Sequence, residues 1–176
     1  MSYITTVTGK HFDPIEPDKE LIDLFDIALA LSLLCRGNGH TKIFYSVAQH
    51  CISCALEAQA CGYSREVILG CLLHDASEAY LSDVTRPVKK DLPYYLEVEE
   101  KLQNVLWEHF IGRQLTEEER KQIFAIDDQI LSAEFQQVMY RPINEDYKLL
   151  KRELNCEYEN PKQVREQFIR MYEKMT

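Results

Sequence analysis

An adjacent histidine–aspartate pair, His74 and Asp75, is the part of the sequence best suited to chemistry. It follows the apolar run Val67–Leu73, so we expect both side chains to be largely shielded from water. Burying two ionisable groups is costly unless they are paired or bind a metal ion. Imidazole nitrogens and carboxylate oxygens are suitable ligands for Zn, Mn, Fe or Co. The pair therefore predicts a metal site, although a lone His-Asp dipeptide also occurs by chance.

Two other segments offer further ligands. His50 lies beside the apolar stripe of a helix expected over residues 46–61, where a lone histidine would be read as a packed core residue. Asp127 and Asp128 lie mid-helix among apolar neighbours, although aspartate is a poor helix former. Three expected helices thus supply ligands in the order His, His-Asp, Asp. The residues themselves leave Asp127 and Asp128 both open as the last ligand.

The elements that must position these side chains are helices. Apolar residues recur at helical spacing, and no segment shows the alternation of a strand. We expect an irregular arm over 1–17, a loop over 82–93, and helices over about 19–36, 46–61, from 64, 94–111, 116–140 and from 161. Thr116 and Glu119 have the spacing of a capping box. The predicted fold class is all-α, a compact bundle of about six or seven helices, in one domain over 1–176 with a helical extension over 143–176.

Composition narrows the class of partner. The 176 residues suit one domain, and a formal net charge of −9 argues against a broad nucleic-acid-binding face. The sequence contains no run of about 20 apolar residues, so we expect no membrane span. The N-terminus lacks the pattern of a secretion signal. We therefore expect a cytoplasmic protein whose six cysteines are thiols. Cys51 and Cys54 have the spacing of a zinc knuckle, but no second pair follows, so we expect them in the core.

The order His, His-Asp, Asp resembles the metal-binding pattern of the HD-domain phosphohydrolases. Four longer segments are similar to one branch of that family, the bacterial and phage proteins related to HD-domain 5′-deoxynucleotidases. These segments are Cys35-Arg-Gly-Asn-Gly-His-Thr41, Phe44-Tyr-Ser-Val-Ala-Gln-His50, Leu73-His-Asp-Ala-Ser-Glu-Ala-Tyr80 and Asp83-Val-Thr-Arg-Pro-Val-Lys89. The resemblance covers roughly residues 3–140. It implies an HD-domain fold.

The resemblance also implies a ligand set. His50, His74 and Asp75 match three metal ligands, and Asp127 is favoured as the fourth because the family's aspartate precedes a glutamate by seven residues, as Asp127 precedes Glu134. The cofactor expected is one divalent ion, with Co, Mn, Zn, Fe or Mg all open. No further histidine lies near the His-Asp pair, which favours one ion over two.

Substrate and catalytic roles follow from the same resemblance. Arg36 matches an arginine that contacts the substrate phosphate, as a guanidinium can with two parallel hydrogen bonds, while Glu78 and Asp83 match acids that assist proton transfer. Lys89 and His40 are further candidates for substrate binding. Simpler readings stay open: Arg36 favouring a helix end, Lys89 as a solvated charge, and His40 as a turn residue.

The function expected is hydrolysis of the 5′-phosphate of a (deoxy)nucleoside monophosphate, a small-molecule substrate. One alternative is a deoxynucleoside triphosphate triphosphohydrolase, for which Lys42, Arg86, Lys89 and Lys90 could supply positive charge. A second alternative is a non-catalytic nucleotide-binding HD module. We expect no nucleic-acid or membrane partner, and the aromatic helix over 94–111 could support a homodimer.

Overall fold

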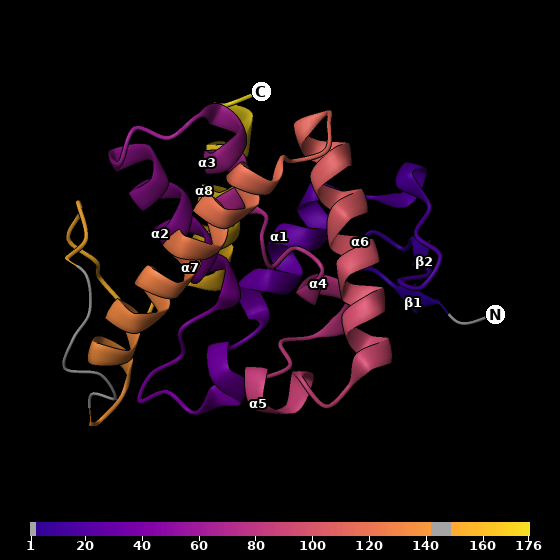
Figure 1. The fold of residues 1–176 in the computed structure, drawn as a ribbon. Helices are drawn as coiled ribbons and strands as arrows, with labels where there is room; N and C mark the ends of the chain where they lie inside the picture. Colours follow the sequence, from indigo (N-terminus) through magenta and orange to yellow (C-terminus); the bar gives the residue numbers. More distant parts are fainter. Residues whose placement is uncertain (1–2, 142–148) are drawn as a thin grey trace.

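A computed structural model describes residues 3–141 and 149–176, and helices dominate it (Figure 1). The described part contains eight α-helices: α1 (Leu24–Leu33), α2 (Val47–Ala60), α3 (Arg65–Leu72), α4 (Glu78–Leu81), α5 (Arg86–Lys89), α6 (Pro93–Ile111), α7 (Glu117–Val138) and α8 (Pro161–Glu173). The all-α class is confirmed. The count exceeds the expected six or seven because α4 and α5 are single turns of four residues. Residues 143–148 of the predicted helical extension lie outside the described residues.

The N-terminal arm is more regular than expected. β1 (Ile4–Thr5) pairs antiparallel with β2 (His11–Phe12), and Phe12 is fully buried with its ring stacked on Tyr80 at 4.1 Å between centroids. Strands of two residues are too short to show alternation. The prediction of an irregular arm was therefore wrong at these positions, because a tertiary contact, the burial of Phe12, fixes the hairpin.

Local capping signals set most of the helix boundaries. Ser46 and Gln49 form a capping box at the start of α2, Thr116 and Glu119 form the predicted one at the start of α7, and the Ser64 side chain caps α3. The first helix is shorter than expected, because the Asp23 carboxylate accepts hydrogen bonds from the backbone of Phe25 and Asp26 and so starts α1 at Leu24. The expected loop over 82–93 contains α5.

Helix α3 is the centre of the bundle. Every residue from Val67 to Leu72 is buried, and α3 packs against α2, α6, α7 and α8. The α3–α7 contact is close at Gly70, where any side chain would overlap Ile123. Because α3 ends at Leu72, His74 and Asp75 emerge from the middle of the core. No helix among the described residues is long and apolar enough to cross a membrane.

Candidate metal centre

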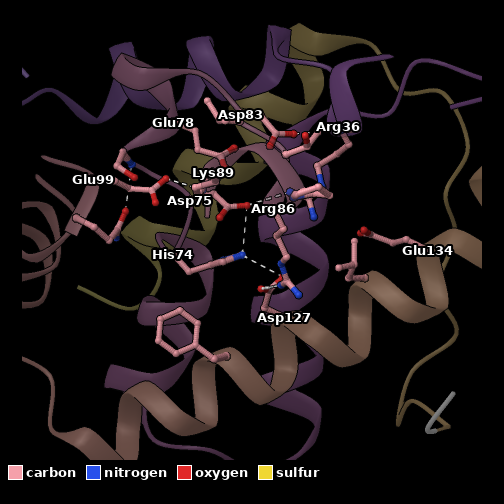
Figure 2. A pocket seen from close by; sticks show the side chains of 18 of the residues that line it. Arg36, His74, Asp75, Glu78, Asp83, Arg86, Lys89, Glu99, Asp127 and Glu134 are labelled. Atoms are coloured by element: carbon pink, nitrogen blue, oxygen red, sulfur yellow. Dashed lines mark hydrogen bonds and ion pairs between the residues drawn. The ribbon is translucent and has the colours of Figure 1, made fainter. Parts of the chain in front are cut away.

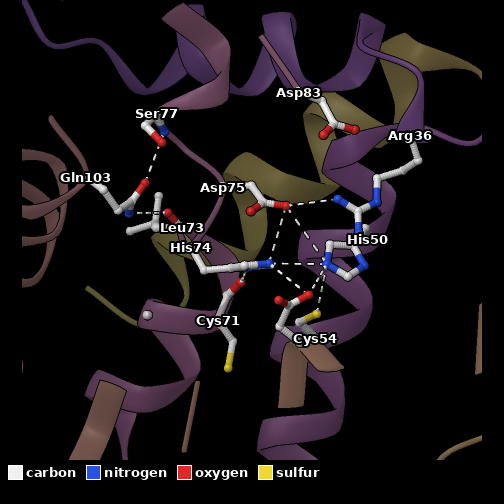
Figure 3. A network of polar contacts seen from close by, with 12 residues as sticks. Arg36, His50, Cys54, Cys71, Leu73, His74, Asp75, Ser77, Asp83 and Gln103 are labelled. Carbon is white, nitrogen blue, oxygen red and sulfur yellow. Dashed lines mark hydrogen bonds and ion pairs between the residues drawn. The ribbon is translucent and has the colours of Figure 1, made fainter. Parts of the chain in front are cut away.

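The structure brings the four predicted ligands together from three parts of the chain. Figure 3 shows three of them, His50, His74 and Asp75, pointing toward one another. His50 comes from α2, His74 and Asp75 follow α3, and Asp127 comes from α7. The Nε2 atoms of the two histidines lie 3.2 Å apart, and Oδ1 of Asp127 lies 3.0 Å from Nε2 of His50. Oδ2 of Asp75 lies 3.3 Å from Nε2 of His74. Donor atoms at about 2.1 Å from one ion are about 3.0–3.4 Å apart. Two further separations are longer, at 3.7 Å between Nε2 of His74 and Oδ1 of Asp127 and 3.9 Å between Nε2 of His50 and Oδ2 of Asp75. A shared metal ion would therefore draw these atoms slightly closer.

The outer nitrogens of both imidazoles are already engaged. Nδ1 of His50 lies 2.9 Å from each carboxylate oxygen of Glu134, and Nδ1 of His74 lies 2.7 Å from the Cys71 carbonyl oxygen. A carboxylate and a carbonyl accept hydrogen bonds, so each Nδ1 carries a proton. When each ring is neutral, its Nε2 lone pair faces the other histidine and the two carboxylates, and a bound cation would resolve their repulsion.

The charge of the surroundings supports the same conclusion. Burial alone lowers the pKa of His50 and of His74, because it disfavours the imidazolium. Neighbouring carboxylates, Glu134 and Asp127 for His50 and Asp75 for His74, outweigh burial and raise both pKa values. The acidic environment thus favours positive charge between these rings, which a divalent ion would supply.

Cys54 belongs to this group although the sequence reading placed it only in the core. Its Sγ lies 3.6 Å from Nε2 of His50, and it forms a potential metal-binding group with His50, His74 and Asp127. Cys51 forms a second such group, with His74 and Asp75. Both cysteines are fully buried, as expected, and burial raises the pKa of each thiol. The signal that could have found Cys54 is its position one turn after His50 on the same helix face.

Two adjacent aspartates of α7 occupy different environments. The Asp127 side chain is 14% exposed and faces the histidines, while that of Asp128 is 64% exposed. Arg86 joins them on the outside, with Nη2 2.9 Å from Oδ2 of Asp127 and Nη1 2.8 Å from Oδ1 of Asp128. The structure therefore places Asp127, and not Asp128, among the potential ligands.

Arg36 lies beside the group, in a tight turn. The turn Arg36–Gly39 has left-handed backbone at Gly37 (φ 57°) and Gly39 (φ 80°), a conformation that glycine adopts without strain. Nη1 of Arg36 donates to Oδ2 of Asp75 at 3.2 Å. Burial lowers the pKa of Arg36, but Asp75 and other nearby carboxylates raise it by more than burial lowers it. The guanidinium therefore stays charged. Since α1 ends at Leu33, Arg36 is not part of that helix.

The two predicted acids have different partners. Oδ2 of Asp83 accepts a hydrogen bond from the backbone nitrogen of Gly37 at 3.1 Å, which holds the turn that carries Arg36. Glu78 is 5% exposed, and its Oε2 has no hydrogen-bond partner among the described residues. Burial raises the pKa of Glu78 well above its usual value, and the negative charges of Asp75 and Asp83 add to this effect. The surroundings of Glu78 therefore favour its protonated form.

Lys89 and His40 line the same cavity as the other predicted residues except His50. Nζ of Lys89 lies 2.6 Å from Oε1 of Glu99, and 5.7 Å from the ring centroid of Tyr95. Its charge is thus already paired. His40 is exposed, and its backbone nitrogen donates to the Gly37 carbonyl, which closes the turn after Arg36.

A cavity of about 1250 Å³ opens beside the four candidate metal ligands (Figure 2). Helices α6 and α7 both pack on α3, and each contributes one face to the cavity wall. The predicted residues Arg36, His40, His74, Asp75, Glu78, Asp83, Lys89 and Asp127 all line it. His50 is fully buried behind them. Acids outnumber bases, since eight carboxylates and five Lys or Arg side chains line the cavity.

The known proteins that this chain resembles are uncharacterized, so the resemblance assigns no function. No protein-family model matches the chain. The chain is 42% identical over 110 residues to the uncharacterized protein YfdR of Escherichia coli K12, and 36% identical over 101 residues to an uncharacterized protein of Rhodobacter capsulatus. These alignments cover 62% and 54% of this chain, and 59% and 52% of the relatives. The chain thus matches little more than half the length of either relative, and function must be argued from the site.

Proposed function

We propose that the protein is a metal-dependent phosphohydrolase of the HD-domain type, which removes the 5′-phosphate of (deoxy)nucleoside monophosphates. One observation carries the proposal. His50, His74, Asp75 and Asp127 converge with Nε2 and carboxylate oxygen atoms at metal-ligand spacing, directly beside the charged Arg36 and at the wall of a large cavity. A set of potential metal ligands next to a mostly buried guanidinium is suited to binding a phosphate ester.

A divalent ion held by these four residues would polarise a phosphoryl oxygen and make a bound water more acidic. Arg36 would bind and orient the phosphate. A guanidinium has five N–H donors, and the hydrogen bond to Asp75 engages one of its nitrogens, Nη1, leaving others for two parallel hydrogen bonds to phosphate. Asp83 would act through Arg36, as a positioning residue, because it holds the Gly37 backbone.

Glu78 would supply the proton for the leaving group. When water attacks phosphorus, the P–O5′ bond breaks and the sugar oxygen departs as a poor alkoxide unless it gains a proton. Glu78 is buried at the cavity wall, with a raised pKa and an oxygen that has no partner among the described residues. These properties suit a neutral carboxylic acid that donates its proton during bond cleavage.

The pairing of the basic residues named for a triphosphate site favours a monophosphate over a triphosphate. Of the four basic residues named for a triphosphate site, Lys42 and Lys90 are not among the lining residues. Arg86 is paired with Asp127 and Asp128, and Lys89 is paired with Glu99. A triphosphate would have to displace these carboxylates from their partners. The metal group and Arg36 are sufficient for one phosphate.

The test is product analysis with the protein stripped and reloaded with Co²⁺, Mn²⁺ or Zn²⁺. The substrates are nucleoside monophosphates and triphosphates, and both orthophosphate and triphosphate are quantified. His74→Ala and Asp75→Ala serve as blanks. Orthophosphate from monophosphates, absent from the blanks, is the expected result. Triphosphate release moves the assignment to a triphosphohydrolase, and no release with any metal, together with a nucleotide-induced thermal shift, moves it to a non-catalytic binding module.

A further inference from the structure

We propose that the cleft between α6 and α7 contains a nucleobase subsite, in which Phe124 stacks on the base and Asn104 hydrogen-bonds to its edge. This inference rests on the proposed nucleotidase function, because it assigns the part of the cavity that would hold the rest of that substrate. The cavity, at about 1250 Å³, is larger than a phosphate and a sugar require, since drug-sized ligands occupy pockets of about 300–1,000 Å³.

Phe124 presents aromatic surface to the cavity. It lines the cavity, is 50% exposed, and lies outside the hydrophobic core clusters. Its ring packs edge-on against Trp107, with centroids 6.5 Å apart, while Trp107 itself is 2% exposed and is covered by the Arg120 guanidinium at 5.1 Å. The ring of Phe124 is thus held in place by Trp107 and still open to a ligand. A flat heteroaromatic ring stacked on it would remove apolar surface from water.

Asn104 is a second, independent indication of a ligand at this end of the cleft. Its Oδ1 is buried without a hydrogen-bond partner among the described residues, and the residue lines the cavity. A buried amide oxygen without a partner is unfavourable in free energy. Asn104 precedes Trp107 by one turn on the same face of α6, so it lies near Phe124. A turn of its side chain would offer a donor and an acceptor to the edge of a base.

The spacing along α7 fits a nucleotide. Phe124 precedes Asp127 by three residues, which places the two on the same helix face with Cβ atoms about 5–6 Å apart. One sugar separates phosphate and base in a nucleoside monophosphate, so a phosphate at Arg36 and the metal group leaves the base beside Phe124. Phe135, Val138 and Met139 line the cavity at the other end of α7. That end is less suitable, because Val138 is buried in a cluster with Tyr45 and Cys156, and Phe135 and Met139 are partly buried against this cluster.

The first measurement is the binding of deoxyadenosine, which has no phosphate, to the metal-free protein by NMR titration. Phe124→Ala is expected to weaken binding about 10- to 100-fold, because base–aromatic stacking is lost, and Phe124→Tyr is expected to retain it. Asn104→Ala should weaken binding about fivefold, by loss of a neutral hydrogen bond. Phe25→Ala is the matched control, because Phe25 is also exposed, at 39%, but does not line the cavity. Thermal unfolding checks that each variant folds.

The second measurement separates this inference from the proposed function. In the reloaded protein, Phe124→Ala should raise KM for deoxyadenosine monophosphate about 10- to 100-fold and leave hydrolysis of deoxyribose 5-phosphate unchanged. Phosphate release that is unaffected by Phe124→Ala would overturn the subsite while the phosphohydrolase stands. Phe124-dependent binding of deoxyadenosine without any phosphate release would uphold the subsite and overturn the phosphohydrolase. Absence of deoxyadenosine binding to the native protein would overturn the subsite.

Discussion

The carboxylate of Glu134 on α7 contacts Nδ1 of His50 on α2, with both oxygens 2.9 Å from that nitrogen. This contact fixes the ring so that Nε2 points at His74 and Asp127. Tyr45 donates a hydrogen bond to the same carboxylate at 2.8 Å and holds it in place. The imidazole is therefore oriented toward the potential metal-binding group by two side chains that are not themselves among the candidate ligands.

Replacing Glu134 by glutamine tests this relationship. The amide oxygen of Glu134→Gln can still accept from Nδ1, but the negative charge that makes the ring more basic is gone. We expect Zn²⁺ or Co²⁺ affinity to fall about 10- to 100-fold, as for other partners of metal-bound histidines, when measured by competition with a chelator. Tyr45→Phe keeps the carboxylate and should change the affinity much less. Equal affinity in Glu134→Gln and the native protein would refute this role.

The adjacent aspartates of α7 give a matched pair for the metal site. Asp127→Asn removes a carboxylate that lies 3.0 Å from His50, whereas Asp128→Asn removes one that is mostly exposed. We expect Asp127→Asn to lose most of the bound metal after reloading, and Asp128→Asn to retain it at the native stoichiometry. Metal analysis of the purified variants measures both. Retention by Asp127→Asn, or loss by Asp128→Asn, would mean that the fourth ligand is assigned wrongly.

Arg36 and Arg86 differ in burial, with side chains 14% and 63% exposed. Arg36→Ala should weaken inhibition by orthophosphate about 10- to 100-fold, since a charge-assisted hydrogen bond contributes about 1.5–3 kcal/mol. Arg36→Lys should recover only part of this, because an ammonium cannot form two parallel bonds. Arg86→Ala is the control and should change the inhibition constant less. If Arg86→Ala weakens inhibition by orthophosphate more than Arg36→Ala does, then Arg86 and not Arg36 makes the phosphate contact.

Gly70 tests the close packing of α3 on α7. A Cβ at this position would overlap the end of the Ile123 side chain, so Gly70→Ala forces the two helices or that side chain to shift. Overpacking of this kind costs about 1–3 kcal/mol, partly offset by the better helix propensity of alanine. We expect a lower midpoint in urea unfolding. Gly70→Ala combined with Ile123→Val should recover part of the loss, and a native midpoint in the single variant would show that α3 and α7 do not meet so closely.

Glu119 predicts a pH dependence of stability. Hydrogen bonds from Arg113, and further ones from Thr116, lower its pKa from the usual 4.5 to about 2, although burial acts in the opposite direction. A carboxyl whose pKa is lower in the folded state stabilises the fold above the unfolded pKa, and this contribution is lost as pH falls from 4.5 towards 2. In Glu119→Gln the melting temperature should therefore fall less over that interval than in the native protein. Glu118→Gln, in the same helical turn, is the control and should follow the native curve.

The sequence by itself determined the fold class and the residue types of the site. Helical periodicity predicted the all-α class, and the capping box of Thr116 and Glu119 predicted the start of α7, because these signals act within a few residues. The histidines and aspartates stood out because ionisable groups amid apolar neighbours need a partner. These inferences needed only local chemistry.

The tertiary structure decided which side chains meet. The rotation of α7 against α3 directs Asp127 inwards and leaves Asp128 to Arg86. The turn after α1 gives Asp83 a backbone partner at Gly37. Burial of Phe12 makes a hairpin of two strands too short to show a pattern. In each case the contact joins residues distant in sequence, so its energy depends on packing that no local signal encodes.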